Sequence, residues 1–186
     1  IGPRLHENCP HGVVQELYSP NDSAALEQAI AAGYRQVYGN AHVMDFERSV
    51  ELEAQLCNGD LNVRDFIRGL AKSSFYKKRF FEGVAPQRGI ELNTKHLLGR
   101  PPQSQSEMPR LIGILNEGGH NAVVDALVDS AEYAEVFGED IIPYARAWNS
   151  PADLSTACFP NMAALERSFA ISDSAVGARS ILQGNL

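Results

Sequence analysis

The sequence has no apolar run long enough to cross a membrane. Its longest apolar stretches, such as 29–32 and 111–115, fall far short of the roughly 20 residues that a transmembrane helix needs. Cysteine is also scarce. Cys9, Cys57 and Cys158 are odd in number and never form a CxxC spacing, which argues against a disulfide framework and a zinc site. The sequence therefore predicts neither a membrane span nor a fold held by disulfides or zinc.

Positive charge is in short supply. The chain has 16 Lys or Arg residues against 23 Asp or Glu residues, a net charge of −7. Nucleic-acid binding requires a surplus of Lys and Arg to neutralise phosphates, so a nucleic-acid partner is disfavoured. Motifs of catalysis are missing as well: there is no GxSxG element, no HExxH pair among the five histidines and no Gly-rich phosphate loop. We therefore predict that the chain is not an enzyme and carries no metal or cofactor of its own.

The charges that are present lie unevenly along the chain. Residues 71–100 carry seven Lys or Arg and two Glu, a net +5, whereas residues 111–140 carry seven Asp or Glu and no Lys or Arg. Such runs are either solvated helix faces or surfaces complementary to charged protein partners. Both interpretations stay open at this point.

Apolar residues recur at helical spacing along most of the chain, and no run shows the period-two alternation of a strand. Capping residues precede many of these segments and glycines follow them. Helices are predicted over 23–38, 45–57, 63–70, 75–81, 86–98, 106–116, 122–130 and 131–137. The predicted fold class is all-α. The chain is predicted to comprise an N-terminal extension over 1–22, one multi-helix domain over 23–147 and a weakly structured C-terminal extension over 148–186.

A short pattern, L-x-x-S-x-x-Y-x-x-x-F, occurs at 70–80 and again at 127–137. In each copy the Ser can cap a short helix, and the Tyr and Phe, four residues apart, lie on one face of it. We therefore expect the Tyr and Phe of both copies to point into the core. The two copies differ in charge, because the first carries KKR where the second carries AEV.

The first copy continues into the segment FYKKRFF at 75–81, which combines aromatic and cationic side chains within two helical turns. If Tyr76 and Phe80 face the core, Phe75 and Phe81 lie nearer the outer face, since adjacent residues are separated by about 100° on a helix. Aromatic residues and Arg anchor many protein interfaces. The segment therefore predicts a protein-binding surface; an RNA partner is the weaker alternative because the net charge is negative.

Several longer segments resemble the phycobilisome linker domain found in rod linker polypeptides. They are AAGYRQVYGN at 31–40, VRDFIRGLAKSSFYKKRFF at 63–81, IELNTKHLLGRPPQSQSE at 90–107, DSAEYAEVFGEDIIPYARAW at 129–148 and FPNMAALERSFAISDSA at 159–175. The resemblance extends from about residue 24 to the end of the chain. It implies an all-helical domain that lies in the central cavity of phycobiliprotein trimers or hexamers and joins these discs into rods. It also implies that the domain tunes the spectra of the partner's bilins for directional energy transfer in photosynthetic light harvesting.

The same resemblance implies partners and a location. The partners are the α and β subunits of phycoerythrin or phycocyanin together with other linkers, on the cytoplasmic or stromal face of the thylakoid membrane in a cyanobacterium or a red-algal plastid. The bilins belong to the partner subunits. The residues expected to contact the partner are Arg35, Phe75, Lys77, Lys78, Arg79, Phe81 and Arg100.

Two alternatives remain. The chain is a chromophore-bearing linker if one cysteine forms a thioether with a bilin, and Cys158 is then the best candidate because it lies in the weakly structured tail. An unmodified thiol is the simpler expectation, since a single Cys usually packs as a small apolar residue. The other alternative is a generic helical scaffold unrelated to pigment, which would bind no phycobiliprotein.

Overall fold

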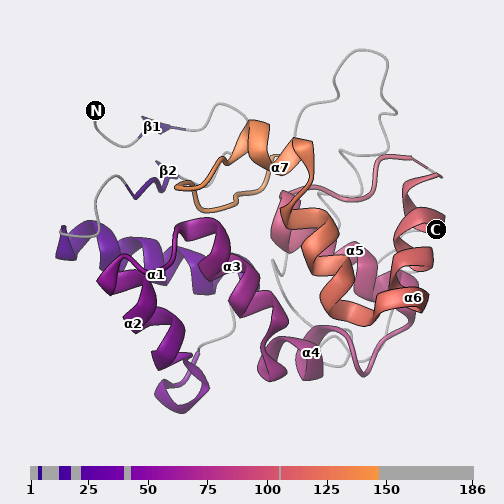
Figure 1. Ribbon diagram of the computed structural model, residues 1–186, viewed down its shortest axis with the longest axis horizontal. Coiled ribbons are helices and arrows are strands. Elements are labelled where there is room, and N and C mark those ends of the chain that lie inside the picture. Colours follow the sequence, from indigo (N-terminus) through magenta and orange to yellow (C-terminus); the bar gives the residue numbers. More distant parts are fainter. Residues whose placement is uncertain (1–3, 6–12, 18–21, 40–42, 105, 147–186) are drawn as a thin grey trace, which may run out of the picture.

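The computed structural model describes residues 4–5, 13–17, 22–39, 43–104 and 106–146 (Figure 1). The described part is predominantly helical, which confirms the all-α prediction. Its helices are α1 Ser23–Tyr38, the 3₁₀ helix η1 Asp45–Glu47, α2 Val50–Asn58, α3 Val63–Lys72, α4 Ser74–Phe80, α5 Pro86–Leu98, α6 Glu107–Val128 and α7 Ala131–Val136. No described helix is both long enough and apolar enough to pass through a bilayer.

Side-chain caps start several of these helices where the sequence predicted them. The Asp22 carboxylate accepts hydrogen bonds from the backbone N–H groups of Ala24 and Ala25, each at 3.1 Å, and so begins α1. The Asn62 side chain accepts one from the backbone of Asp65 at 2.8 Å and begins α3. Because a cap satisfies N–H groups that have no partner within the helix, these starts depend on local sequence alone.

The helix predicted over 45–57 is wrong in one respect, because the structure divides it. A short 3₁₀ turn ends before Arg48, whose φ of −72° and ψ of 144° are extended, and α2 begins only at Val50. The apolar spacing across 46–56 suits one helix, so the break must come from tertiary contacts of this segment.

The expectation that the chain has no strand also needs correction. Two-residue strands, β1 Arg4–Leu5 and β2 Val13–Val14, pair antiparallel. The segment after β2 then forms an isolated bridge between Glu16 and Ile141, just past α7. A pairing between positions so far apart in the chain leaves no local periodicity by which it could be predicted.

One hydrophobic core holds the helices together. Helix α3 is central to it, because α3 contacts α1, α2 and α4 and also packs on α6, while α5 and α6 pack against each other (Figure 1). Gly33 lets α1 approach α3 closely: a Cβ atom there would lie 2.9 Å from the Phe66 ring. The close packing of α1 on Phe66 therefore explains a glycine within a helix, where its propensity is poor.

Helix α6 spans the two helices that the sequence predicted over 106–116 and 122–130. Gly119 has a φ of 71° and a ψ of −172°, which is not helical, and the helix resumes directly after it. The two predicted helices on either side are thus two segments of α6 that meet at a kink, since glycine adopts positive φ without steric strain.

Candidate partner-binding surface

Helix α4 carries the basic and aromatic segment, and its inner face matches the prediction from the repeat. Ser73 accepts a hydrogen bond from the backbone of Tyr76 at 3.1 Å, and Ser130 accepts the equivalent bond at the start of α7. Tyr76 and Phe80 are completely buried, with ring centroids 5.0 Å apart. Tyr133 and Phe137 of the second copy are buried as well. The inward orientation of both aromatic pairs is therefore confirmed.

The outer face of α4 presents a group of cations that meet no acidic partner among the described residues. Lys78 is exposed, and Lys77 and Arg79 are partly exposed. Within the described ranges these three side chains form no ion pair. The Arg79 guanidinium lies instead over the rings of Phe75 and Phe80, at 5.9 and 5.8 Å from their centroids. We call Lys77, Lys78 and Arg79 the α4 basic cluster.

Elsewhere, Arg68 of α3 and Lys72 of the basic run pair with residues of the acidic run. Arg68 of α3 binds Asp129 at 2.6 Å and Asp125 at 3.1 Å, and Lys72 binds Asp125 at 2.6 Å. These contacts connect α3 to the end of α6. Lys72 is thus paired within the fold, whereas the α4 basic cluster forms no ion pair in the described ranges.

Phe75 and Phe81 lie at intermediate depth rather than on an open surface. The Phe75 ring packs on Tyr38 with centroids 4.6 Å apart, and the Phe81 ring packs on His120 at 4.6 Å. A Cβ atom at Gly89 would come within 2.7 Å of Phe81, so the absence of a side chain there makes room for this ring. The expectation that both rings lie nearer the outer face than Tyr76 holds, but each also packs against the fold.

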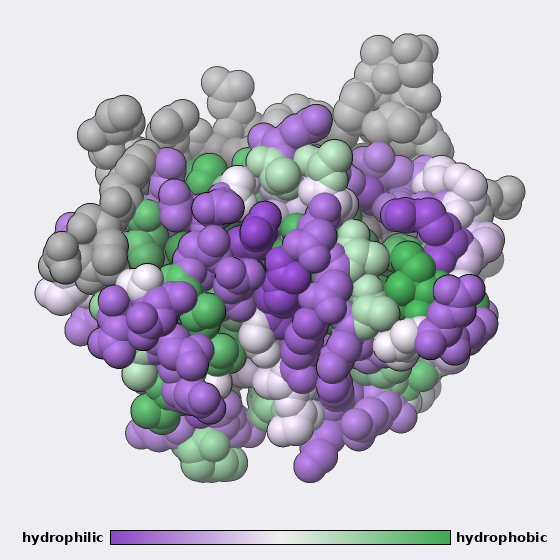
Figure 2. Space-filling model, in the orientation of Figure 1, coloured by the Kyte–Doolittle hydropathy of each residue, from purple (hydrophilic) through white to green (hydrophobic). Residues whose placement is uncertain are grey.

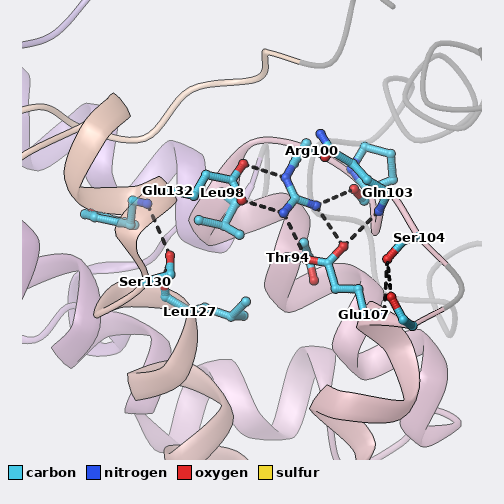
Figure 3. A network of polar contacts seen from close by, with 12 residues as sticks. Thr94, Leu98, Arg100, Gln103, Ser104, Glu107, Leu127, Ser130 and Glu132 are labelled. Atoms are coloured by element: carbon cyan, nitrogen blue, oxygen red, sulfur yellow. Dashed lines mark hydrogen bonds and ion pairs between the residues drawn. The ribbon is translucent and has the colours of Figure 1, made fainter. Parts of the chain in front are cut away.

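Arg100 occupies a different environment from the one expected of a partner contact. It is only 5% exposed, and its guanidinium binds Glu107 at 2.9 and 3.1 Å and Glu132 at 2.5 and 2.6 Å (Figure 3). Its position in a basic stretch indicated an exposed cation. The acidic residues that bind it come from α6 and α7, so Arg100 has a structural role in this chain, and its contact with a partner stays a prediction.

The remaining candidates are Arg35, for partner binding, and the cysteines, for bilin attachment. Arg35 is exposed in the last turn of α1. It lies three residues before Tyr38, whose ring packs on Phe75, so this end of α1 adjoins α4. Cys158 lies outside the described residues, and its attachment to a bilin stays a prediction. Cys57 at the end of α2 is exposed, with a free thiol.

A buried polar cluster behind α4 was not predicted. The Tyr76 hydroxyl donates to the Asn93 side-chain oxygen at 2.9 Å and lies 2.8 Å from Nδ1 of His96. His120 lies 3.4 Å from the same Asn93 oxygen. The motif KHLLGR around His96 signalled a helix end, and nothing local indicated that its histidine would meet a tyrosine from α4. The cluster anchors the inner side of the helix that carries the basic residues.

Acidification is expected to destabilise this cluster through His120. Burial, with a smaller contribution from Lys77, lowers the pKa of His120 from 6.5 to about 4. The unfolded chain therefore takes up a proton near pH 6.5, whereas the folded chain does so only near pH 4. Stability is retained above pH 6.5 and falls as the pH drops through this window, by on the order of 3 kcal/mol in total.

Urea unfolding at a series of pH values measures this loss, and His120→Gln is the matched variant because glutamine does not titrate. The variant should lose clearly less stability than the wild type between pH 6.5 and 4. Equal losses in both proteins would show that another group is responsible.

No arrangement for catalysis or metal binding emerges from the residues that the structure describes. In those ranges no three His, Cys, Asp or Glu side chains gather closely enough to hold a metal ion. The predicted absence of a cofactor on this chain stays a prediction.

Comparison with known proteins gives one family and several similar chains. The family described as Phycobilisome Linker polypeptide matches residues 21–146. The phycoerythrin class 2 subunit gamma, linker polypeptide, of Synechococcus sp. (strain WH8020) is 52% identical over 97% of this chain and 62% of its own length. A phycoerythrin-associated 27.9 kDa rod linker of Microchaete diplosiphon is 41% identical over 91% of this chain and 68% of its own length. A phycocyanin-associated 31.6 kDa rod linker of the same organism is 42% identical over 85% of this chain and 55% of its own length.

Proposed function

We infer that this chain, which belongs to the phycobilisome linker polypeptide family, joins phycobiliprotein discs into the rods of a phycobilisome. The role is structural rather than catalytic. The helical domain lies in the central cavity of a phycobiliprotein trimer or hexamer, contacts other linkers, and tunes the spectra of the partner's bilins. The assembly lies on the cytoplasmic or stromal face of the thylakoid membrane. The family membership and the names of the similar proteins support this proposal.

Phycoerythrin is the proposed disc protein. The chain is 52% identical to a phycoerythrin gamma subunit over 97% of its length, whereas a phycocyanin-associated linker reaches 42% over 85%. The chain spans 62% of that gamma subunit's length. The preference for phycoerythrin therefore rests on the part of the gamma subunit that this chain matches.

The α4 basic cluster carries the proposal. Lys77, Lys78 and Arg79 remain without acidic partners in the described parts of the chain, while Arg68, Lys72 and Arg100 are paired. Unpaired cations held together on a short helix with a buried aromatic face are suited to an acidic protein surface. The cluster thus supplies positive charge that an acidic wall of the partner's cavity would attract.

Reversing charge in the α4 basic cluster is expected to weaken binding to phycoerythrin. Lys78→Glu should raise the dissociation constant by about tenfold, and Lys78→Glu with Arg79→Glu by more, because each change replaces an attraction with a repulsion. The difference from wild type should be largest at low salt and shrink as added salt screens exposed charges. Titration of phycoerythrin hexamers with the full chain, followed by calorimetry at two salt concentrations, measures both effects.

Arg110→Glu is the matched control, because Arg110 is exposed on α6, far along the chain from α4. It should bind like the wild type. Similar weakening by Arg110→Glu and Lys78→Glu would mean that net charge, and not the α4 basic cluster, governs binding.

A further inference from the structure

A second surface, chemically unlike the α4 basic cluster, lies at η1 and the start of α2. Met44, Phe46 and Val50 are 47%, 83% and 70% exposed, and no other large hydrophobic side chain in the described ranges is exposed. In Figure 2, green and pale-green atoms emerge among purple ones at the lower left, where Figure 1 places α2 and the segment before it. We call Met44, Phe46 and Val50 the η1 ridge. Exposed apolar residues that gather in one place indicate an interaction site.

The η1 ridge stands on a rigid base. The Arg48 guanidinium binds Glu53 through two hydrogen bonds of 2.9 and 2.7 Å, and the Tyr34 hydroxyl donates to the same carboxylate at 2.7 Å. Tyr34 in turn accepts a hydrogen bond from the backbone of Ser49 at 2.8 Å. These contacts also explain why the chain departs from helical geometry at Arg48: the guanidinium and the Ser49 backbone are held against Tyr34 of α1.

Phe46 takes no part in this network, although the network fixes the backbone on both sides of it. The Met44 backbone N–H donates to the Glu47 carboxylate at 2.9 Å, and the Glu47 N–H donates to the Met44 carbonyl at 2.8 Å. An aromatic side chain presented on an ordered backbone loses little further freedom on binding. Such a residue is typical of an interface anchor, because the fold holds it in place without burying it.

A groove beside the η1 ridge shows what kind of surface fits there. It has a volume of about 410 Å³ and is lined by Glu27, Ile30, Ala31, Tyr34, Val43 and Arg48. Its aliphatic walls suit a hydrocarbon stem. Arg48 is already bound by Glu53, whereas Glu27 is exposed at the groove. Asp45 and Glu51, both exposed, add negative charge around the ridge. The complementary surface is therefore apolar with Lys or Arg at its edge.

We propose that the η1 ridge is a second docking surface for phycobiliprotein, with Phe46 inserted in an apolar pocket and a partner Lys or Arg in the groove beside Glu27. This inference rests on the proposed function, because the partner is the disc protein named there. The two surfaces carry opposite charge, so they select different regions of the partner. Two such contacts of opposite charge therefore fix the orientation in which the linker holds its partner.

Binding of the full chain to purified phycoerythrin hexamers tests the proposal. Phe46→Asp should weaken binding by at least about tenfold, since an anchor is lost and a charge would enter an apolar pocket. Unlike reversal of the α4 basic cluster, this loss should persist at high salt, because apolar contacts are not screened. Glu27→Lys should also weaken binding, and more at low salt. The melting temperature of Phe46→Asp should equal that of the wild type, because the side chain is 83% exposed.

Gln87→Asp is the matched control, because it introduces the same charge at an exposed position on α5. If Phe46→Asp binds as tightly as Gln87→Asp, the η1 ridge is not a docking surface, while the proposed function stands. If the wild type itself binds no phycoerythrin, the proposed function fails and this inference fails with it.

Discussion

Replacing Arg100 with alanine is expected to lower the free energy of unfolding by about 3–5 kcal/mol, because it removes a buried cation that binds two partly buried carboxylates. The Arg100 side chain is 6% exposed and that of Glu107 is 12% exposed. Among the described residues, Glu132, at 31%, keeps Arg146 as its partner when Arg100 is removed. The network joins the segment after α5 to the start of α6 and to α7, so its loss affects three elements at once.

The pKa of Glu107 gives this prediction a second readout. Burial alone would raise that pKa, but hydrogen bonds from Arg100 and from the Gln103 backbone, together with the charge of Arg100, lower it below its ordinary value. Glu107 therefore contributes stability that is present above the pKa of an unfolded Glu and is lost as the pH falls below it. In the Arg100→Ala protein this part of the acid dependence should disappear.

Urea unfolding at neutral pH measures the effect, with Arg35→Ala as the control because Arg35 is exposed on α1. The control should change the free energy of unfolding by less than about 0.5 kcal/mol. Comparable stabilities for the two variants would show that the buried network adds nothing to the fold.

Truncating Phe80 to alanine is expected to cost about 3–5 kcal/mol of stability, as for other buried aromatic residues. The ring is fully buried, with the Tyr76 and His96 rings at 5.0 Å. Its removal leaves a cavity beneath the α4 basic cluster, at the point where α4 meets α5. Thermal or urea unfolding of the full chain measures the loss.

Phe75→Ala is the comparison that separates the two faces of α4. Phe75 is partly buried and packs on Tyr38, so its truncation should cost about 1–2 kcal/mol, less than that of Phe80. The affinity for phycoerythrin should fall by more than the loss of stability explains, because the Arg79 guanidinium lies over the Phe75 ring. Equal destabilisation by Phe75→Ala and Phe80→Ala would mean that the helix has no outer face reserved for a partner.

Features that depend on near neighbours in the chain were predictable. The caps at Asp22, Asn62 and Ser73 each accept a hydrogen bond from a backbone N–H two or three residues further on. The stop at Gly99 follows locally from a residue that adopts positive φ, although the close approach of the Tyr144 carbonyl to Gly99 could not be predicted. The buried Tyr and Phe of both repeat copies follow from a spacing of four residues. These elements form through local geometry, so the local sequence specifies them.

Features that depend on distant partners were not predictable. Arg100 meets Glu132 across 32 positions and Arg68 meets Asp129 across 61, so the charge runs could not reveal which cations would remain unpaired. Arg48 breaks a helix that the apolar spacing favours because Tyr34 and Glu53 hold it from other elements. By itself the sequence determined most of the helices, the caps that begin them and their apolar faces. Only the tertiary structure decided which charged and aromatic side chains remained for a partner, because pairing and burial depend on which helix faces pack together.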